Sequence, residues 1–257
     1  MDKEAILKLP GMPASSPSYP RGPYRFVNRE YFIVVYKTDH DAIRMALPEP
    51  LEPNKDNIVM YEFLKMPDSS GFGDYSESGV VIPCTFNREE MNYTAQMYLD
   101  CSPPIVGGRE IWGFPKKHAQ PKLAIIHDTL TGTLEYAGQL VSMGTMAYKH
   151  ENLIHHERHQ ELADIKVITA KLAKTQVNLK IIPHVDGSTE IAQLVAYNMT
   201  DITIKGAWAG PARLHLVPHV NAPVADFPVR SIVGGSHFIA DITLPYGRVI
   251  HNYLKKD

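Results

Sequence analysis

The chain has few cysteines and no long uncharged apolar run. Only Cys84 and Cys101 occur among its 257 residues, and they are not closely spaced. This excludes a disulfide framework and a zinc knuckle built on paired cysteines. No uncharged apolar stretch approaches the roughly 20 residues that a membrane-spanning helix needs, and the first residues, 1–7, carry acidic side chains where a signal peptide needs positive charge. These absences predict a cytoplasmic protein with reduced thiols.

The chain also lacks an excess of charge of either sign. It has 26 lysine and arginine residues against 28 acidic ones, a formal net charge of -2. No basic field is therefore expected to recruit nucleic acid or a membrane surface, and the aromatic residues are not interleaved with basic stripes. Hydrophobic residues make up 44% of the chain, enough for a sizeable core. A small-molecule partner is the expectation.

Several motifs of common enzyme classes are missing. No Gly-x-Ser-x-Gly nucleophile turn follows a predicted strand. The glycine-containing segments 107–108 and 234–237 match neither a P-loop nor a dinucleotide fingerprint. We expect these glycines in tight turns.

Strand patterns dominate the chain. A proline-rich arm at 10–23 excludes regular structure, and helical patterns are confined to 2–9, to 39–47 after a capping box at 38–41, and to 150–173. Many short strands at close spacing predict one domain, 1–257, of mainly β (α+β) class: an antiparallel, β-barrel-like sheet system with a few flanking helices. The predicted strands are 28–36, 58–66, 79–86, 93–100, 122–128, 131–135, 139–148, 177–185, 191–197, 201–208, 213–217, 238–244 and 248–254.

Histidines in the third predicted helix are a candidate metal site. His155 and His159 lie four positions apart, on one face of a helix. The zinc-protease motif needs Glu directly after the first histidine, however, and His156 stands there. The surrounding polarity favours a solvated helix face, with a metal site as the alternative.

Two consecutive lysines follow an apolar stretch and are a second candidate. Lys116 and Lys117 come after Trp112, Phe114 and Pro115. A lysine becomes nucleophilic when a dry apolar setting or a neighbouring cation destabilises its ammonium form. A pair of solvated surface charges is the common alternative, and these residues alone leave both readings open.

Two acidic residues have neighbours unlike a protein surface, and an arginine could pair with either of them. Strand alternation points Glu62 to the same face as Met60 and Leu64, and a carboxylate there needs a partner or a raised pKa. Glu77 precedes a predicted strand, and Arg29 opens the first one, where it could pair with either acid. Spacing alone leaves structural and functional roles open for all three.

Short motifs occur in a fixed order along nearly the whole chain. They are Ser16-Pro17, Tyr19–Tyr24, Asn28–Phe32, Pro48–Leu51, Glu77–Gly79, Met97–Asp100, Gly108–Glu110, Pro115–Lys117 and Lys180–Pro183. With these motifs the chain resembles the acetoacetate decarboxylase family. The resemblance implies that Lys116 is the Schiff-base lysine, that Lys117 is its cationic neighbour, and that Arg29, Glu62 and Glu77 are the polar site residues.

The resemblance also carries expectations about activity and assembly. It implies decarboxylation of acetoacetate to acetone and CO2 through an iminium on Lys116, with no cofactor or metal, in a homo-oligomer that is usually a dodecamer. Met97 and Phe114 are candidate walls of the substrate pocket. Retention of Arg29 and Glu77 favours a decarboxylase over an aldolase-dehydratase acting on a pyruvate-like keto acid. A non-catalytic keto-acid binding protein of the same fold is the other alternative.

The chemistry requires a neutral amine near pH 6–7, so the pKa of the lysine must fall by roughly 4 units from about 10.4. Apolar burial or an adjacent cation is the known means of this activation in the family. If the lysine pair continues a strand, the two ammonium groups lie on opposite faces, roughly 10 Å apart. Their repulsion is then about 1.7 kcal/mol at a dielectric of ~20, little more than one pKa unit, whereas full desolvation supplies about 3–5 units. We therefore predict that burial of Lys116 dominates and that Lys117 is secondary.

Overall fold

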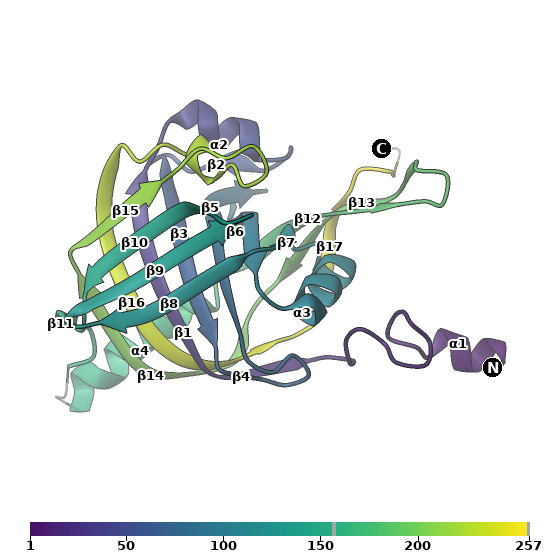
Figure 1. The fold of residues 1–257 in the computed structure, drawn as a ribbon, viewed down its shortest axis with the longest axis horizontal. Helices are drawn as coiled ribbons and strands as arrows, with labels where there is room; N and C mark the ends of the chain where they lie inside the picture. The colour runs from purple at the N-terminus through teal and green to yellow at the C-terminus, as the bar shows by residue number, and fades with distance from the viewer. Residues whose placement is uncertain (156–157, 256–257) are drawn as a thin grey trace.

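The protein is built on two β-sheets, and its computed structural model describes residues 1–155 and 158–255 (Figure 1). The larger sheet has 13 strands, and its main path runs β11-β14-β16-β1-β3-β5-β6-β12-β13-β17, with β2, β4 and β7 attached at its sides. Its strands are β1 (Tyr24–Lys37), β2 (Glu52–Pro53), β3 (Ile58–Met66), β4 (Asp68–Ser69), β5 (Tyr75–Phe86), β6 (Glu89–Leu99), β7 (Lys116–His118), β11 (Glu151–Asn152), β12 (Gln176–Pro183), β13 (Thr189–Tyr197), β14 (Thr200–Gly210), β16 (Ser231–Leu244) and β17 (Arg248–Asn252).

The smaller sheet has four strands in the order β15-β10-β9-β8 and lies in front of the larger one in Figure 1. Its strands are β8 (Gln120–Ile126), β9 (Thr129–Tyr136), β10 (Gln139–Ala147) and β15 (Ala212–Leu216). The mainly β class, with strongly curved sheets that do not close into a barrel, agrees with the predicted architecture. The pairing is antiparallel except where β6 pairs in parallel with β7 and with β12, an exception that the alternation of single strands could not predict.

Strand β1 separates two hydrophobic cores. Phe32 and Val34 are fully buried on the face that packs against Leu130 and Leu134 of the small sheet. Tyr31, which alternates with them, belongs to a second core on the other face. A β-strand presents successive side chains to opposite faces, so this one strand supplies both cores.

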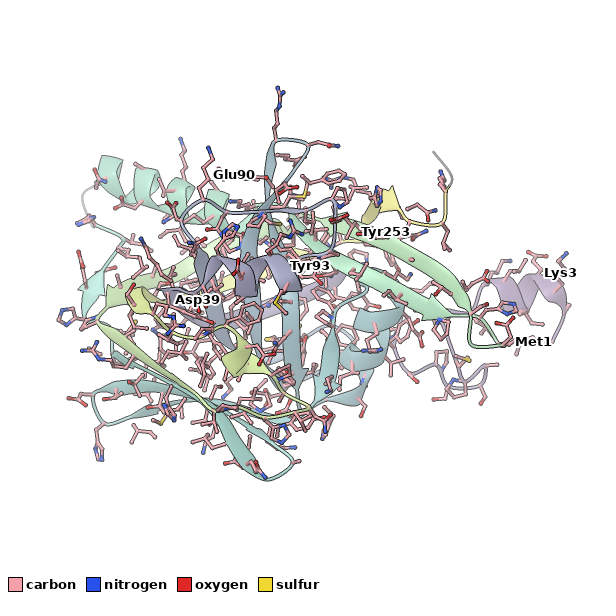
Figure 2. The ribbon with its side chains drawn as sticks, turned by 90° about the horizontal axis from the view of Figure 1, so that it is seen from above. Met1, Lys3, Asp39, Glu90, Tyr93 and Tyr253 are labelled. Atoms are coloured by element: carbon pink, nitrogen blue, oxygen red, sulfur yellow. The ribbon has the colours of Figure 1, made fainter. Side chains whose placement is uncertain are left out.

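Helices occupy the ends and edges of the sheets. The arm that carries α1 (Lys3–Leu7) projects away from the body, as the position of Lys3 in Figure 2 shows. The other helical elements are α2 (His40–Ala46), α3 (Ser102–Gly107), the π-helix η1 (Gly108–Trp112), α4 (Arg158–Leu172) and the 3-10 helix η2 (Val224–Asp226). No helix among the described residues is both long enough and apolar enough to cross a membrane.

Two helix predictions need correction. The predicted helix 150–173 begins later, because 151–152 form β11, paired with β14; residues 156–157 lie outside the described part. The predicted capping box at 38–41 does not form: Asp39 is the N-cap residue but makes no capping hydrogen bond, since its carboxylate accepts two hydrogen bonds from Arg230.

The segment 102–118 also differs from the prediction, which gave it no helix and no strand. Pro103 and Pro104 occupy the first turn of α3, where proline is tolerated because the N–H groups there have no helical partner. The π-helix η1 follows directly and ends at Gly113, whose φ of 75° lies in the left-handed region. The short strand β7 follows this turn.

Candidate active site

Lys116 projects from β7 into a cavity in the second core. Parallel pairing with β6 sets Lys116 opposite Met97 and Lys117 opposite Tyr98. Lys116 is only 7% exposed, whereas Lys117 is on the exposed face of the strand. The structure therefore confirms that the two lysines point to opposite faces.

Gly108, the first residue of η1, makes room for the Lys116 side chain. A Cβ atom at this position would lie 2.8 Å from Cδ and 3.3 Å from Nζ of Lys116. A contact of 2.8 Å between these carbon atoms is far inside van der Waals distance. The helical turn before β7 thus approaches the lysine as closely as it does only because residue 108 has no side chain.

Glu77 lies between two cations. Its Oε1 is 2.7 Å from Nζ of Lys116, and its Oε2 is 3.9 Å from Nη2 of Arg29. All three side chains are buried, so their charges interact in surroundings that screen them weakly. The contact with Lys116 is an ion pair without hydrogen-bond geometry, because Oε1 has no hydrogen-bond partner among the described residues. A carboxylate at this distance can accept a proton from the lysine.

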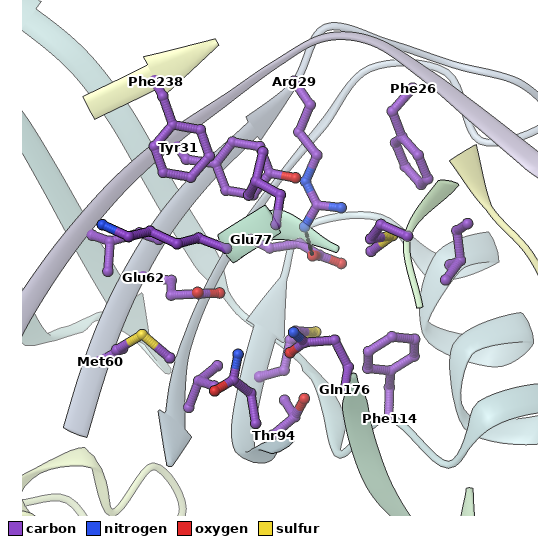
Figure 3. A pocket seen from close by; sticks show the side chains of 18 of the residues that line it. Phe26, Arg29, Tyr31, Met60, Glu62, Glu77, Thr94, Phe114, Gln176 and Phe238 are labelled. Carbon is purple, nitrogen blue, oxygen red and sulfur yellow. Dashed lines mark ion pairs between the residues drawn. The ribbon is translucent and has the colours of Figure 1, made fainter. Parts of the chain in front are cut away.

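Glu62 lines the same cavity from β3 (Figure 3). Register with the neighbouring strands sets it opposite Ile33 of β1 and Gly79 of β5. Burial raises the pKa of its carboxyl group to about 7, with the guanidinium of Arg29 opposing the increase and the charge of Glu77 adding to it. Glu62 can therefore exchange a proton near neutral pH.

Aromatic rings and apolar side chains form most of the cavity wall, and the cavity volume is about 290 Å³. The ring centre of Phe114 lies 4.9 Å from Nζ of Lys116. The guanidinium carbon of Arg29 lies 4.7 Å from the ring centre of Tyr31 and 5.3 Å from that of Phe26. Met97 also lines the cavity. The amine of Lys116 therefore lies in mostly apolar surroundings.

Lys117 lies outside this cavity. Its ammonium donates a hydrogen bond to the backbone oxygen of Asn221 and lies 5.1 Å from the ring centre of Tyr136. Of the sequence-predicted site residues, Arg29, Glu62, Glu77, Met97, Phe114 and Lys116 line the cavity together, and Lys117 does not.

Several tyrosines at the site were not among the candidate residues of the sequence analysis. Tyr31, Tyr75 and Tyr197 come from three different strands and line the cavity. Burial raises the pKa of all three, that of Tyr31 to about 12, so their hydroxyl groups are neutral at physiological pH. In each strand the tyrosine alternates with outward-facing residues, so a local pattern can indicate a buried face. A local pattern cannot indicate that the three strands meet at one cavity.

The histidine candidate receives no support as a metal site. His155 is exposed, and its Nδ1 lies 2.9 Å from Oδ2 of Asp164. The side chain of His159 lies outside the described part. Within the described residues, no group of three or more His, Cys, Asp or Glu side chains is placed to hold a metal ion.

Comparison with known proteins gives one consistent result. Residues 9–254 match the family model described as acetoacetate decarboxylase (ADC). An acetoacetate decarboxylase of Acidiphilium cryptum is 53% identical over 243 residues, which are 95% of each chain. One from Burkholderia mallei is also 53% identical, over 95% of this chain and 94% of its own.

Solved structures agree with the sequence matches. The acetoacetate decarboxylase of Legionella pneumophila superposes with a TM-score of 0.87 at 47% identity, covering 93% of this chain and 92% of its own. An enduracididine biosynthesis enzyme has a TM-score of 0.78 at 18% identity over 95% of this chain and 96% of its own. The second match is evidence for a shared fold alone.

Proposed function

Because the chain belongs to the acetoacetate decarboxylase family, it converts acetoacetate to acetone and CO2 through a lysine Schiff base, and we propose that Lys116 is that lysine. The observation that carries this assignment is the burial of Lys116 in an apolar cavity with its amine 2.7 Å from Glu77. It is the one buried lysine in the part of the chain that the structure describes. Most lysines are solvated, so a buried amine beside a proton acceptor is a site for nucleophilic catalysis.

The geometry supports a role for each charged residue in forming the iminium. Glu77 accepts the proton of the Lys116 ammonium, and the neutral amine attacks the ketone carbon of acetoacetate. A proton moves from the amine nitrogen to the former carbonyl oxygen to give a carbinolamine. Protonated Glu77 then returns its proton to this hydroxyl group, which leaves as water, and an iminium ion remains. Arg29 attracts the substrate carboxylate, which reaches a pocket whose other side chains are mostly apolar.

Carbon dioxide then leaves, and the bonding electrons move into the iminium to give an enamine. Glu62, whose pKa of about 7 leaves it partly protonated at neutral pH, supplies the proton to the enamine carbon. Water then hydrolyses the resulting iminium to acetone and free Lys116. Phe114 and Met97 keep the amine in apolar surroundings, and Lys117, on the other face of β7, has at most an indirect effect.

Borohydride trapping tests this assignment. The protein is incubated with acetoacetate and borohydride, the modified lysine is mapped by mass spectrometry, and CO2 is measured alongside. We expect reduction of the iminium to a stable secondary amine on Lys116, no adduct in Lys116→Arg, and an undiminished adduct in Lys117→Ala. An adduct on another lysine would overturn the assignment. An adduct without CO2 or acetone would instead indicate keto-acid binding without turnover.

We also infer the properties that the family resemblance implies beyond the reaction itself. The chain is proposed to work as one domain, 1–257, with no cofactor or metal beyond the covalent Schiff base, in the cytoplasm, as a homo-oligomer that is a dodecamer. The larger sheet supports a single domain, since it contains both β1 and β17. The net charge of -2 favours a small-molecule partner over nucleic acid or a membrane.

A further inference from the structure

The alternation of cavity-facing residues along strand β1 is interrupted between positions 26 and 29. Phe26 lines the cavity, and so do Arg29, Tyr31 and Ile33. In a regular strand, residues an odd number of positions apart point to opposite faces. Phe26 and Arg29 can face the same cavity only because the alternation is interrupted between them.

The interruption is a β-bulge against β16. Phe26 pairs with Ile242 and Arg29 pairs with Ala240, so two residues of β1, Val27 and Asn28, lie opposite the single residue Asp241. Asn28 has a φ of 55°, a left-handed conformation that asparagine tolerates better than most residues. One extra residue on one strand reverses the facing of every side chain beyond it.

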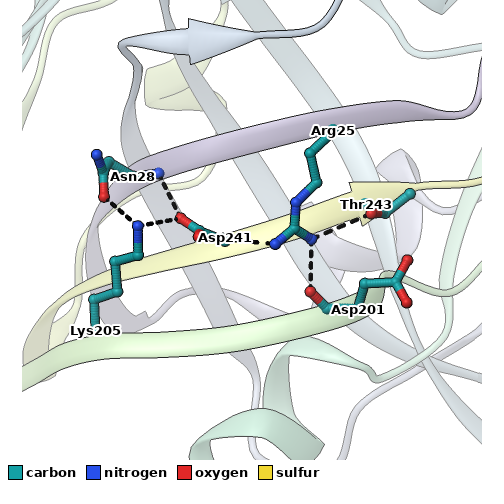
Figure 4. A network of polar contacts seen from close by, with 6 residues as sticks. All are labelled: Arg25, Asn28, Asp201, Lys205, Asp241 and Thr243. Carbon is teal, nitrogen blue, oxygen red and sulfur yellow. Dashed lines mark hydrogen bonds and ion pairs between the residues drawn. The ribbon is translucent and has the colours of Figure 1, made fainter.

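Asp241 holds this bulge from the outer face of the sheet (Figure 4). Its Oδ1 accepts a hydrogen bond from the backbone N–H of Asn28 at 2.8 Å and forms an ion pair with Nζ of Lys205 at 2.7 Å. Lys205 also donates to Oδ1 of Asn28 at 2.6 Å. We call Asn28, Lys205 and Asp241 the bulge clamp.

Two neighbouring features reinforce the clamp. Lys205 lies at a register shift of its own, between Ile204 and Gly206 of β14, so Asp241 binds the irregular residues of both strands that flank β16. Arg25 approaches Oδ2 of Asp241 at 3.8 Å. Burial opposes ionisation of Asp241, but the Asn28 N–H, Lys205 and Arg25 together hold its pKa below the ordinary value.

We propose that Asp241 is a positioning residue for the decarboxylation reaction: by fixing the bulge at Asn28 it turns Arg29 into the cavity beside Glu77. This inference rests on the proposed role of Arg29. Without the bulge, β1 would continue its alternation from Phe26, and Arg29 would point to the outer face. Asp241 is not among the residues that line the cavity, so its effect on the substrate is indirect, through the residues of β1 that the bulge turns inward, and Arg29 is the charged one among them.

Substitutions at Asn28 separate the conformation of the bulge from its side-chain contacts. Glycine adopts a positive φ at no steric cost, so Asn28→Gly is expected to keep kcat/KM for acetoacetate within about 3-fold of the parent. Valine is β-branched and strongly disfavours this conformation, so Asn28→Val is expected to lower kcat/KM by roughly 10-fold or more. Equal values for the two variants would overturn the proposal.

A double-mutant cycle tests the route through Arg29. We expect Asp241→Ala to lower kcat/KM by roughly 10-fold when Arg29 is present and to have no further effect in Arg29→Ala. Asp241→Asn keeps an oxygen for the Asn28 N–H and is expected to recover most of the loss. An equal loss from Asp241→Ala in both backgrounds would mean a general structural role and would overturn the proposal.

Two controls distinguish the possible failures. Asp39→Ala breaks another surface ion pair, with Arg230 at 2.6 Å, and is expected to leave kcat/KM unchanged. Circular dichroism verifies that every variant is folded. If Arg29→Ala alone has the parent kcat/KM, the proposed role of Arg29 is wrong; if Arg29→Ala is impaired but Asp241→Ala is not, only the role of Asp241 is wrong.

Discussion

Glu77 supplies the negative charge that compensates two buried cations. Lys116 and Arg29 approach its two carboxylate oxygens from different strands. In surroundings that screen charge weakly, removal of this carboxylate leaves both cations without compensation. The same carboxylate takes up the amine proton in the proposed mechanism, so its charge matters for both stability and catalysis.

We therefore expect Glu77→Gln, which keeps the shape of the side chain but removes its charge, to lower kcat by roughly 10²- to 10⁴-fold, the usual range for a positioned general base. Steady-state CO2 release measures the effect. Glu90→Gln is the matched control, since Glu90 is exposed and pairs with Lys174 at 2.9 Å. An unimpaired Glu77→Gln would exclude Glu77 as the proton acceptor.

Glu62 should make the stability of the protein depend on pH. Its pKa is raised from 4.5 to about 7 by burial, with Arg29 opposing and Glu77 adding to the shift, so the folded chain binds a proton that the unfolded chain releases. Its contribution is fully present below about pH 4.5 and is lost as pH rises through about 7. The loss amounts to as much as about 3 kcal/mol.

Urea unfolding at pH 5 and pH 8, at fixed protein concentration, checks this prediction. We expect Glu62→Gln to reduce the decrease in the free energy of unfolding between these pH values, because glutamine does not titrate. Glu90→Gln should retain the decrease. If Glu62→Gln and the parent have the same pH dependence, Glu62 does not titrate in this range.

At the scale of elements, the approach of η1 to β7 sets the space available to Lys116. We expect Gly108→Ala to slow imine formation by roughly 10-fold or more, because the added Cβ would lie 2.8 Å from Cδ of Lys116, and a displacement of about 1 Å at a reacting group can cost 10²-fold. The rate of borohydride-trapped adduct formation measures it. Gly234→Ala is the control, since a Cβ there meets nothing within 4 Å. Equal rates in the two variants would contradict this account.

The contact between the two sheets depends on a pair of facing glycines. Gly132 of β9 lies opposite Gly144 of β10, and both leave space for the ring of Phe63 on β3. A Cβ at residue 132 would lie 2.2 Å from Cγ of that ring. The glycines are therefore required by close packing in the strand interior.

Gly132→Ala should destabilise the fold by about 1–3 kcal/mol, the usual cost of overpacking a core, without changing the rate of imine formation at a fixed temperature. Phe63 and Glu62 are neighbours on β3 and point to opposite faces, so the strain falls on the core between the sheets. The urea midpoint reports the stability, and Gly234→Ala is again the control. A parent-like midpoint would show that the ring can move aside.

At the scale of the whole molecule, the N-terminal arm carries apolar side chains that the chain itself leaves uncovered. Ile6, Leu7 and Met12 are 53%, 73% and 74% exposed, and α1 has no buried residue. Contact with another copy of the chain would bury them, in line with the proposed homo-oligomer.

Light scattering on the intact protein should then give a mass that is a multiple of 28.8 kDa, twelvefold for a dodecamer. We expect the double variant Ile6→Ser, Leu7→Ser to associate more weakly than the parent, since burial of apolar area drives association. On dilution it should therefore dissociate while the protein concentration is still higher than the concentration at which the parent dissociates. Met45→Ser alters another exposed side chain, on α2, and should leave the mass unchanged. A monomeric parent would refute the proposed oligomer.

The sequence by itself determined what depends on neighbours along the chain. Alternation with period two identified most strands, and it correctly set Lys116 and Lys117 on opposite faces because that period is a property of the local backbone. Strand alternation and neighbouring residues drew attention to Glu62, Glu77 and Arg29 but left their roles open, and only the family resemblance implied that they are site residues. The helices and the strand of 102–118 were not predicted, because the prolines and glycines there are equally compatible with turns.

Tertiary structure decided what depends on contacts between distant segments. Arg29, Glu62, Glu77 and Lys116 come from four strands, and only the pairing order of the large sheet brings them to one cavity. The bulge that turns Arg29 inward requires Asp241, which lies on another strand more than 200 positions away. A strand's alternation fixes which residues share a face, but its partners across the sheet fix where that alternation is interrupted, and here the interruption places the arginine beside Glu77.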